Sequence, residues 1–433
     1  MRWQTAVGYL LPVAWIVVLL ALYDVLHPVA RLLGATALLL LAVKVGAWVL
    51  LRGRSGRFSL SPFQFVLFWT VWPAVRPDRF ADADEKRPPK ASEFAVGYVS
   101  IVAGILLGVA TLFLAPVVGM TLGSWLLIAA FFLVIHFGIG LVLPFALRWV
   151  GIPVPSLFDR PLRSRGVGEF WARRWNLPFV QMNRLFVTHP LRLRLGVGGA
   201  AFVAFVVSGI LHELAISYAA GGGWGLPFLY FMIQAALYTI EAKTFPDEGW
   251  ELARRVWTWA AVLVPLPLLF HGPFRQTFLV PFIDVGRSAM LSYSVTEYLA
   301  LALWVGAAGH FLVLVASSQV PRELEWREEL QQLQPLNRKL MWTYGGFIVL
   351  VIVSFGVLTI LFHGEFIDGN PVALGLSGMI AAFWTARVLV DIFYFDHDDW
   401  PEGVEYIVGH VLLTSLFAFL VVAYGGTVAF HVL

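Results

Sequence analysis

The fold is decided by apolar runs such as GVGGAAFVAFVVSGILHELAISYA, residues 196–219 of this 433-residue chain. A helix rises about 1.5 Å per residue, so about 20 apolar residues cross the hydrocarbon layer of a bilayer. Similar runs recur along the whole chain, of which 59% is apolar and 13% is charged. Soluble domains usually carry about twice that charged fraction. The sequence therefore predicts an all-α protein, a polytopic bundle of membrane-spanning helices.

Eleven runs of this kind are expected to cross the membrane. They lie near residues 6–27, 29–51, 95–118, 121–146, 196–219, 225–243, 256–271, 293–317, 341–362, 371–394 and 405–431. The first run is too long for the core of a signal peptide and lacks a clear cleavage site, so we expect it to be retained as a span.

A shorter apolar stretch, residues 60–75, lies between two basic loops. Lys and Arg accumulate in cytoplasmic loops, and a crossing here would put one basic loop outside. We therefore expect this stretch to be re-entrant or interfacial. The same rule places the N-terminus and the arginine-rich loop 147–195 in the cytoplasm and the C-terminus outside. The preference for Arg over Lys, with abundant Ala, Gly and Val, suggests a bacterial inner membrane.

The chain contains no cysteine, which excludes disulfides, thiolate metal sites and a cysteine acyl-enzyme. The sequence also lacks a phosphate-binding P-loop, a Gly-Xaa-Ser-Xaa-Gly elbow and a His-Glu-Xaa-Xaa-His zinc motif. The segment Asp396-His397-Asp398-Asp399 could hold a cation, but an acidic solvated loop is the preferred interpretation. We predict no metal site and no nucleic-acid partner.

The first segment with candidate chemistry is GEFWARRWNLP, residues 168–178. Apolar side chains follow a three-to-four spacing typical of an amphipathic interfacial helix: Trp171, Trp175, Phe179, Met182 and Phe186. Pro178 cannot continue a preceding helix and favours extended geometry at Leu177, so Asn176 is expected near a helix end with its amide free. The alternative is that Asn176 only caps a helix beside a lipid-facing Trp pair.

The second segment is SGILHEL, residues 208–214, inside an apolar run. Ionisable residues at membrane depth are costly and normally face a bundle interior or a water-filled cavity. His212 has an ordinary pKa near neutrality, which makes it the natural general base. Ser208 lies one turn earlier on the same face, and Glu213 is expected to reach a structural partner on another helix. The alternative is that these polar residues only cross-link helices through hydrogen bonds.

Other polar residues also fall within the predicted spans. Three are histidines: His136, His310 and His410. Arg387 and Asp391 are four residues apart on one predicted helix, and we expect them to form a structural ion pair.

The two segments together resemble the membrane-bound O-acyltransferase superfamily. The motif FWARRWN, residues 170–176, is followed 36 positions after Asn176 by His212 within the motif LHE. Trp72-Pro73, the HFG motif at 136–138 and the GGGWG turn at 221–225 are similar to the wax-ester synthase branch, plant-type and bacterial. The resemblance covers residues 1–290, which we expect to form the catalytic membrane domain. Residues 291–433 lie outside it and are expected to add transmembrane helices of unknown role.

The resemblance implies an enzyme that transfers a fatty acyl group from acyl-CoA, its co-substrate, to a long-chain alcohol without a cofactor. His212 corresponds to the membrane histidine taken as the catalytic base, and Asn176 to the residue that orients the substrate or the histidine. Weaker substrate contacts are predicted for Trp171, Arg173, Arg174, Trp175, Ser208, Glu213 and His136. The phosphates of CoA would remain cytoplasmic, where Arg173, Arg174, Arg192 and Arg194 could meet them or could only set the topology.

Two alternatives remain open at this point. The same chemistry could acylate a polysaccharide, a sterol or another lipid, although the aromatic-Asp-Trp-Trp-Asn motif of related sterol and diacylglycerol acyltransferases is missing. A membrane transporter or proton relay would instead line a path with His136, His212, Arg387 and Asp391. Inverted repeats, which many transporters carry, are not evident in the sequence.

Overall fold

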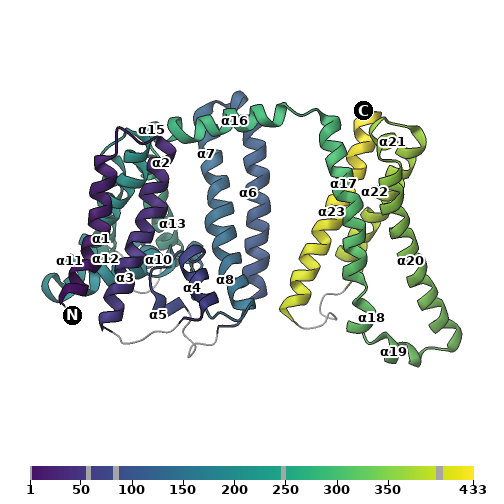
Figure 1. Ribbon diagram of the computed structural model, residues 1–433, viewed down its shortest axis with the longest axis horizontal. Helices are drawn as coiled ribbons and strands as arrows, with labels where there is room; N and C mark the ends of the chain where they lie inside the picture. The colour runs from purple at the N-terminus through teal and green to yellow at the C-terminus, as the bar shows by residue number, and fades with distance from the viewer. Residues whose placement is uncertain (1, 55–59, 81–86, 245–249, 396–402) are drawn as a thin grey trace. The chain divides into compact units, whose positions relative to one another are not determined.

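The computed structural model describes residues 2–54, 60–80, 87–244, 250–395 and 403–433. Within these ranges the chain is helical and contains no strand (Figure 1). It divides into two compact units, Met1–Arg287 and Ser288–Leu433. Each unit is considered by itself below.

Nine helices in the described ranges are long and apolar enough to cross a membrane. They are Pro28–Arg52, Ala91–Val118, Met120–Trp149, Leu177–Tyr218, Glu251–Leu269, Val295–Glu323, Pro335–Leu361, Pro371–Phe393 and Val404–Val432. Two shorter apolar helices, Thr5–Ala21 and Leu226–Glu241, fall on the two remaining predicted runs. The predicted all-α polytopic bundle is thereby confirmed, and the chain is a multi-pass membrane protein.

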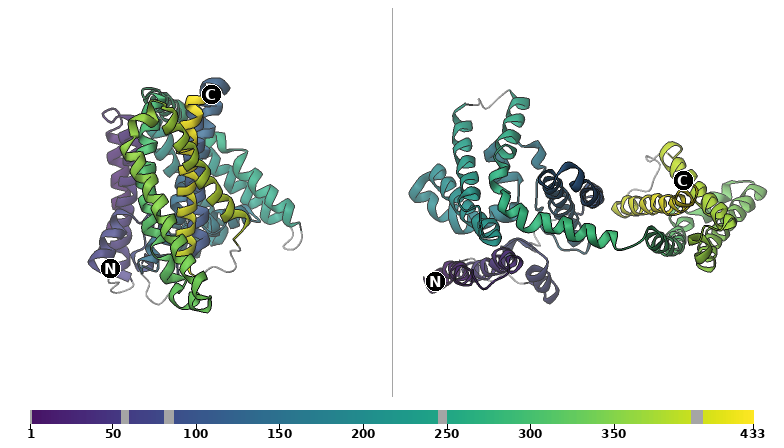
Figure 2. Two further views of the ribbon diagram at one scale, coloured as in Figure 1. Left: turned by 90° about the vertical axis from the view of Figure 1, so that its right-hand side faces the viewer. Right: turned by 90° about the horizontal axis from the view of Figure 1, so that it is seen from above.

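The first unit begins with a hairpin of α1 (Arg2–Ala21) and α3 (Leu39–Arg54), which lie side by side in Figures 1 and 2. A Cβ atom on Gly46 would collide with the carbonyl oxygen of Gly8. The absence of both side chains therefore lets the two backbones approach closely, as small residues do between membrane helices.

The stretch expected to be re-entrant or interfacial contains only the short helix α4 (Pro62–Thr70). Nine residues rise about 14 Å, too little to cross the hydrocarbon layer. A capping box between Ser61 and Gln64 starts the helix. At its other end the buried ammonium of Lys44, on α3, donates to the carbonyl oxygens of Phe68, at 2.5 Å, and Trp72. A cation at a helix C-terminus is favourable, so α3 holds α4 in place.

A second antiparallel pair joins α6 (Ala91–Val118) to the continuous rod formed by α7 (Met120–Phe131), η2 (Phe132–Ile139) and α8 (Gly140–Trp149). Gly97 and Gly104 leave room for side chains of the facing rod. At one end Arg148 of α8 is buried and donates to Glu93 of α6 at 2.6 Å and to the carbonyl oxygen of Val154 at 2.9 Å. This ion pair fixes the loop that follows α8.

The predicted amphipathic helix through residues 171–186 is wrong in one respect, because the structure breaks it. The chain forms α9 (Val167–Glu169) and η4 (Phe170–Arg174), becomes extended at Trp175, turns left-handed at Asn176, and restarts as α10 (Leu177–Asn183). Leu177 is helical rather than extended. Pro178 is tolerated because its missing N–H falls in the first turn, where no intrahelical partner exists.

From α10 the chain continues through η5 (Arg184–Thr188), α11 (His189–His212) and η6 (Glu213–Tyr218). Helices α12 (Leu226–Thr244) and α13 (Glu251–Leu263) follow, and α11 packs on both α12 and η5. Short segments complete this unit and its exit: α2 (Pro28–Leu33), η1 (Gly34–Leu38), α5 (Pro77–Phe80), η3 (Pro161–Arg163), α14 (Leu266–Leu269), α15 (Gly272–Phe274), η7 (Arg275–Leu279) and α16 (Val280–Leu291).

The second unit contains four long helices, α17 (Val295–Ser317), α20 (Pro335–Leu361), α22 (Pro371–Phe393) and α23 (Val404–Val432). The short segments α18 (Val320–Glu323), α19 (Trp326–Glu329), η8 (Leu330–Gln332) and α21 (His363–Ile367) connect them. Their core includes the fully buried Trp384 and Tyr424. The predicted ion pair is confirmed, since Arg387 Nη1 lies 3.2 Å from Asp391 Oδ1.

Candidate functional site

His212, the last residue of α11, is a half-buried histidine with one ring nitrogen engaged and the other without a hydrogen bond among the described residues. Its Nδ1 lies 2.7 Å from the carbonyl oxygen of Ser208. A carbonyl oxygen only accepts hydrogen bonds, so Nδ1 carries the proton and Nε2 carries the lone pair. In the part of the chain that the structure describes, Nε2 makes no hydrogen bond, and it is not one of the fully buried side-chain atoms that lack a hydrogen-bond partner. The imidazole is therefore set up to accept a proton at Nε2.

Two other intramembrane histidines, His310 and His410, differ from His212 in this respect. Both nitrogens of His310 are used, because Nδ1 lies 2.8 Å from the carbonyl oxygen of Gly306 and Nε2 accepts from Trp384 at 3.1 Å. His410 lies 3.5 Å from the buried carboxylate of Asp391. Both histidines thus make polar contacts within the second unit.

Aromatic side chains surround the imidazole of His212. Its ring centroid lies 4.4 Å from that of Phe231 on α12 and 6.2 Å from that of Phe179 on α10. Trp171 lies behind Phe231, with ring centroids 5.6 Å apart, and its Nε1 donates to Gln234 at 3.0 Å. The predicted substrate residue Trp171 thus reaches His212 through Phe231. Sequence reasoning did not identify Phe231 or Gln234, although a glutamine inside an apolar run is a signal of a buried polar contact.

Ser208 and Glu213 contribute to the position of His212 rather than to its open side. Ser208 is buried, and its hydroxyl donates to the carbonyl oxygen of Ala204 at 2.7 Å, so its backbone rather than its side chain contacts the imidazole. Glu213 accepts from the backbone N–H of Phe228 at 2.8 Å, in the first turn of α12. A carboxylate at a helix N-terminus is stabilising. Glu213 therefore has its structural partner on another helix, as predicted.

Asn176 occupies the break between η4 and α10. Its backbone is left-handed (φ 43°, ψ 61°), and its Oδ1 accepts from the N–H of Phe179 at 3.3 Å as the N-cap of α10. The amide nitrogen is left without a hydrogen bond among the described residues. Asn176 and His212 do not bond to each other there, but Phe179 contacts the His212 ring and is held by Asn176. One short helix thus connects the two predicted catalytic residues.

Trp175 and His136 meet in an aromatic stack. Trp175 is sandwiched between Phe170, at 5.4 Å between centroids, and His136, also at 5.4 Å, with interplanar angles of 13° and 10°. Phe132 stacks on His136 at 4.5 Å and also lies 6.0 Å from Trp175. The Nδ1 atom of His136 is buried without a partner. Because Phe170 also contacts Trp171 at 5.0 Å, the stack adjoins the cluster around His212.

The two arginines of the motif differ in their surroundings. Arg174 binds the carboxylate of Glu169 at 2.6 Å and the carbonyl oxygen of Asp159 at 3.1 Å. Burial favours a raised pKa for Glu169, but the hydrogen bonds from the Arg165 amide and from Arg174 outweigh it and hold the pKa below its usual value. Arg174 therefore fixes the fold of this loop. Arg173 is exposed.

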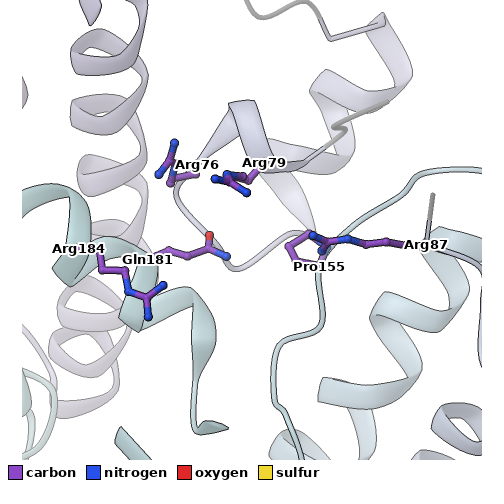
Figure 3. A pocket seen from close by; sticks show the side chains of 6 residues that line it. All are labelled: Arg76, Arg79, Arg87, Pro155, Gln181 and Arg184. Atoms are coloured by element: carbon purple, nitrogen blue, oxygen red, sulfur yellow. The ribbon is translucent and has the colours of Figure 1, made fainter. Parts of the chain in front are cut away.

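A small cavity with an arginine-rich lining opens beside α10. Its volume is about 160 Å³, and we call it the arginine pocket (Figure 3). It is lined by Arg76, Arg79, Arg87, Pro155, Gln181 and Arg184. None of these four arginines is predicted from the sequence as a site residue, because the segments that carry them are far apart in the chain.

The fold and the site define a multi-pass membrane protein with a histidine, one of whose ring nitrogens makes no described hydrogen bond, inside a candidate membrane span. Residues 154–233 match the model of the membrane-bound O-acyl transferase family, and this segment includes both Asn176 and His212. The segment that carries the site is thus similar to that family. The matched residues 154–233 are a minor part of the 433-residue chain.

Curated plant proteins are similar to the chain over limited stretches. A long-chain-alcohol O-fatty-acyltransferase of Simmondsia chinensis is 35% identical over 77 residues, which are 16% of this chain and 22% of that protein. Acyl-CoA–sterol O-acyltransferase 1 of Arabidopsis thaliana is 31% identical over 137 residues, 28% of this chain and 39% of that protein. Probable long-chain-alcohol O-fatty-acyltransferase 8 of Arabidopsis thaliana is 28% identical over 161 residues, 34% and 44%.

The chain thus spans less than half the length of these curated relatives. No solved structure matches the chain.

Proposed function

We propose that this protein is a membrane O-acyltransferase that moves a fatty acyl group from acyl-CoA to the hydroxyl of a long-chain alcohol. The observation that carries the proposal is the state of His212. Its Nδ1 is bound to the Ser208 carbonyl, and its Nε2 makes no hydrogen bond in the described part of the chain. This residue lies inside the segment that matches the family, and two of the relatives quoted above are named long-chain-alcohol O-fatty-acyltransferases.

The reaction needs one general base and no covalent acyl-enzyme intermediate. The alcohol hydroxyl donates to Nε2 of His212, which takes its proton as the oxygen attacks the thioester carbonyl. The tetrahedral intermediate collapses with cleavage of the carbon–sulfur bond, and the CoA thiolate recovers the proton from the imidazolium. General-base help of this kind contributes about 10²–10⁴-fold. The chain has no cysteine that could carry the acyl group in between.

Asn176 has a supporting role in the proposal. Its Oδ1 caps α10, so its two N–H groups are free to stabilise the developing oxyanion, an effect of order 10²–10³-fold. The aromatic side chains Phe231, Phe179 and Trp171 surround the imidazole with apolar surface that suits an acyl chain and a lipophilic acceptor. The positive-inside rule supports a cytoplasmic N-terminus, and the arginine bias supports a bacterial inner membrane.

A sterol is a second candidate acceptor. One relative is named an acyl-CoA–sterol O-acyltransferase, and its similarity covers more of the chain than that of the Simmondsia chinensis protein. A sterol hydroxyl would meet the same base, so the two candidates differ in the acceptor and not in the chemistry.

The test uses the purified full chain with labelled palmitoyl-CoA and a panel of acceptors that includes hexadecanol and a sterol. We expect a labelled ester with hexadecanol and its loss in His212→Ala. His310→Ala is the matched control, because it removes an intramembrane histidine whose nitrogens are both engaged. If an ester forms with the sterol but not with hexadecanol, the proposed acceptor is a sterol instead of a long-chain alcohol. Flux of a substrate into proteoliposomes without any ester would reject the enzyme in favour of a transporter.

A further inference from the structure

The arginine pocket is lined by three segments of the chain, two of which carry the residues that matter most here. Arg76 and Arg79 follow α4, whereas Gln181 and Arg184 belong to α10 and the start of η5. Figure 3 shows these side chains around the same space, with Pro155 and Arg87 on another side of it. Both segments are in loops that the positive-inside rule places on one side of the membrane.

The walls of the pocket are held by contacts outside it. Arg184 donates to the carbonyl oxygen of Ala172 at 3.1 Å, which uses one of its five N–H groups. Pro155 lies between Val154 and Ser156, and both of these accept a hydrogen bond from the buried Arg148. The Pro155 side of the cavity is therefore fixed by the buried Arg148–Glu93 ion pair, and Arg184 is fixed by its bond to Ala172.

The lining selects an anion. Asp78 pairs with Arg76 through Oδ1, 3.1 Å from Nε, and is not itself part of the lining. Arg79 and Arg184 are exposed and direct further guanidinium groups at the same space. Like charges held together repel one another unless an anion lies between them. The planar fork of a guanidinium matches two oxygens of a phosphate, which makes Arg the side chain of choice for this group.

The size of the cavity limits what can enter it. A volume of about 160 Å³ is below the roughly 300–1,000 Å³ of pockets that enclose a whole small ligand. It suits one phosphate-bearing part of a larger molecule whose remainder lies outside. Such a molecule could reach the histidine, because Arg184 is five residues, or about 7–8 Å of helix, beyond Phe179, which contacts the His212 ring.

We propose that the arginine pocket is a binding site for a phosphate group, in which Arg79 and Arg184 are the principal ligands. Two molecules carry this chemistry at a membrane surface, the CoA part of an acyl donor and the headgroup of an anionic phospholipid. The geometry relative to His212 favours the donor, and that assignment rests on the proposed function. The phosphate site itself does not depend on acyl transfer.

Binding is tested with the full chain in phosphatidylcholine nanodiscs, with coenzyme A and adenosine 3′,5′-bisphosphate as probes in titration calorimetry. Arg79→Gln and Arg184→Gln are each expected to weaken binding about 10-fold, since a charge-assisted hydrogen bond contributes about that factor. A higher salt concentration is expected to weaken the binding of coenzyme A to the wild-type protein. Arg163→Gln is the matched control, because Arg163 is an exposed arginine of the same loop region outside the pocket. Thermal unfolding of each variant establishes that it is folded.

The phospholipid arm measures retention of phosphatidylglycerol against phosphatidylcholine by native mass spectrometry. Loss of phosphatidylglycerol in the double variant Arg79→Gln/Arg184→Gln, with coenzyme A binding unchanged, would assign the site to a lipid headgroup. Folded variants that keep both ligands at wild-type affinity would overturn the proposal. If the wild-type chain binds coenzyme A but forms no ester, and the variants lose coenzyme A binding, the phosphate site is retained and the proposed acyltransferase function is rejected.

Discussion

Asn176 offers a sharp test, because its cap and its amide N–H groups can be removed separately. Asp keeps an oxygen for the Phe179 N–H but has no donor, whereas Gly removes both and suits the left-handed backbone. Ala removes the cap, at about 1 kcal/mol, and places a methyl group on a left-handed residue, at about 1–2 kcal/mol. The expected order of stability is therefore Asn and Asp highest, Gly lower by a few tenths of a kcal/mol, and Ala lower by about 2–3 kcal/mol.

Activity is expected to follow a different order. If the amide N–H groups stabilise the oxyanion, Asp and Gly both lose about 10²–10³-fold in kcat while the protein remains folded. Thermal unfolding in detergent and ester formation from labelled palmitoyl-CoA measure the two properties on the same samples. Wild-type kcat in Asn176→Asp would refute the reasoning and leave Asn176 as a helix cap only.

Three further predictions concern the framework of the site. Gln234→Leu should destabilise the protein by about 1–3 kcal/mol in thermal unfolding, because the Trp171 N–H loses its acceptor and the Ala261 carbonyl oxygen loses its donor. Gln234→Glu should not restore this stability, because an ionised carboxylate cannot donate to the Ala261 carbonyl oxygen. Lys44→Met should cost about 1–3 kcal/mol, as the carbonyls of Phe68 and Trp72 lose their donor, and an unchanged melting temperature would contradict this account of α4. The pKa of Glu169 is lowered in the folded protein, so its contribution to stability is present above the unfolded pKa of about 4.3 and is lost as pH falls through the folded pKa. Glu169→Gln should therefore flatten the acid side of a curve of stability against pH. Parallel curves for the wild type and the variant would contradict this role of Glu169.

The membrane fold could be predicted from sequence because length and hydropathy decide it. Each of the eleven runs coincides with a helix of the structure, and basic loops on both sides identified the short stretch around α4 as a segment that does not cross. These signals are local, and a bilayer imposes them on every segment in the same way.

The break at Asn176 could not be predicted from the spacing of apolar residues. The three-to-four pattern continues from Trp171 to Phe179 although the helix stops between them. Extended geometry at Trp175 and a left-handed Asn176 realign the chain, so both parts still direct aromatic side chains inward. Stacking of Trp175 on His136 and Phe170 supplies the tertiary contacts that override the local preference.

The candidate site was only partly accessible from sequence. His212 attracts notice because an ionisable residue in an apolar run is costly, and its assignment as the catalytic base stays a prediction. The contacts that make it distinctive come from other helices, such as Phe231 on α12, or from the backbone, as with the Ser208 carbonyl. The arginine pocket depends on the meeting of Arg79 and Arg184, which no local pattern reports.

The most direct measurement of the central claim is single-turnover ester formation by His212→Asn with saturating palmitoyl-CoA and hexadecanol. The Asn amide can still donate to the Ser208 carbonyl but has no basic nitrogen where Nε2 lies. The account predicts a folded protein whose rate falls by about 10²–10⁴-fold. A rate equal to that of the wild type would show that another group takes the proton of the alcohol.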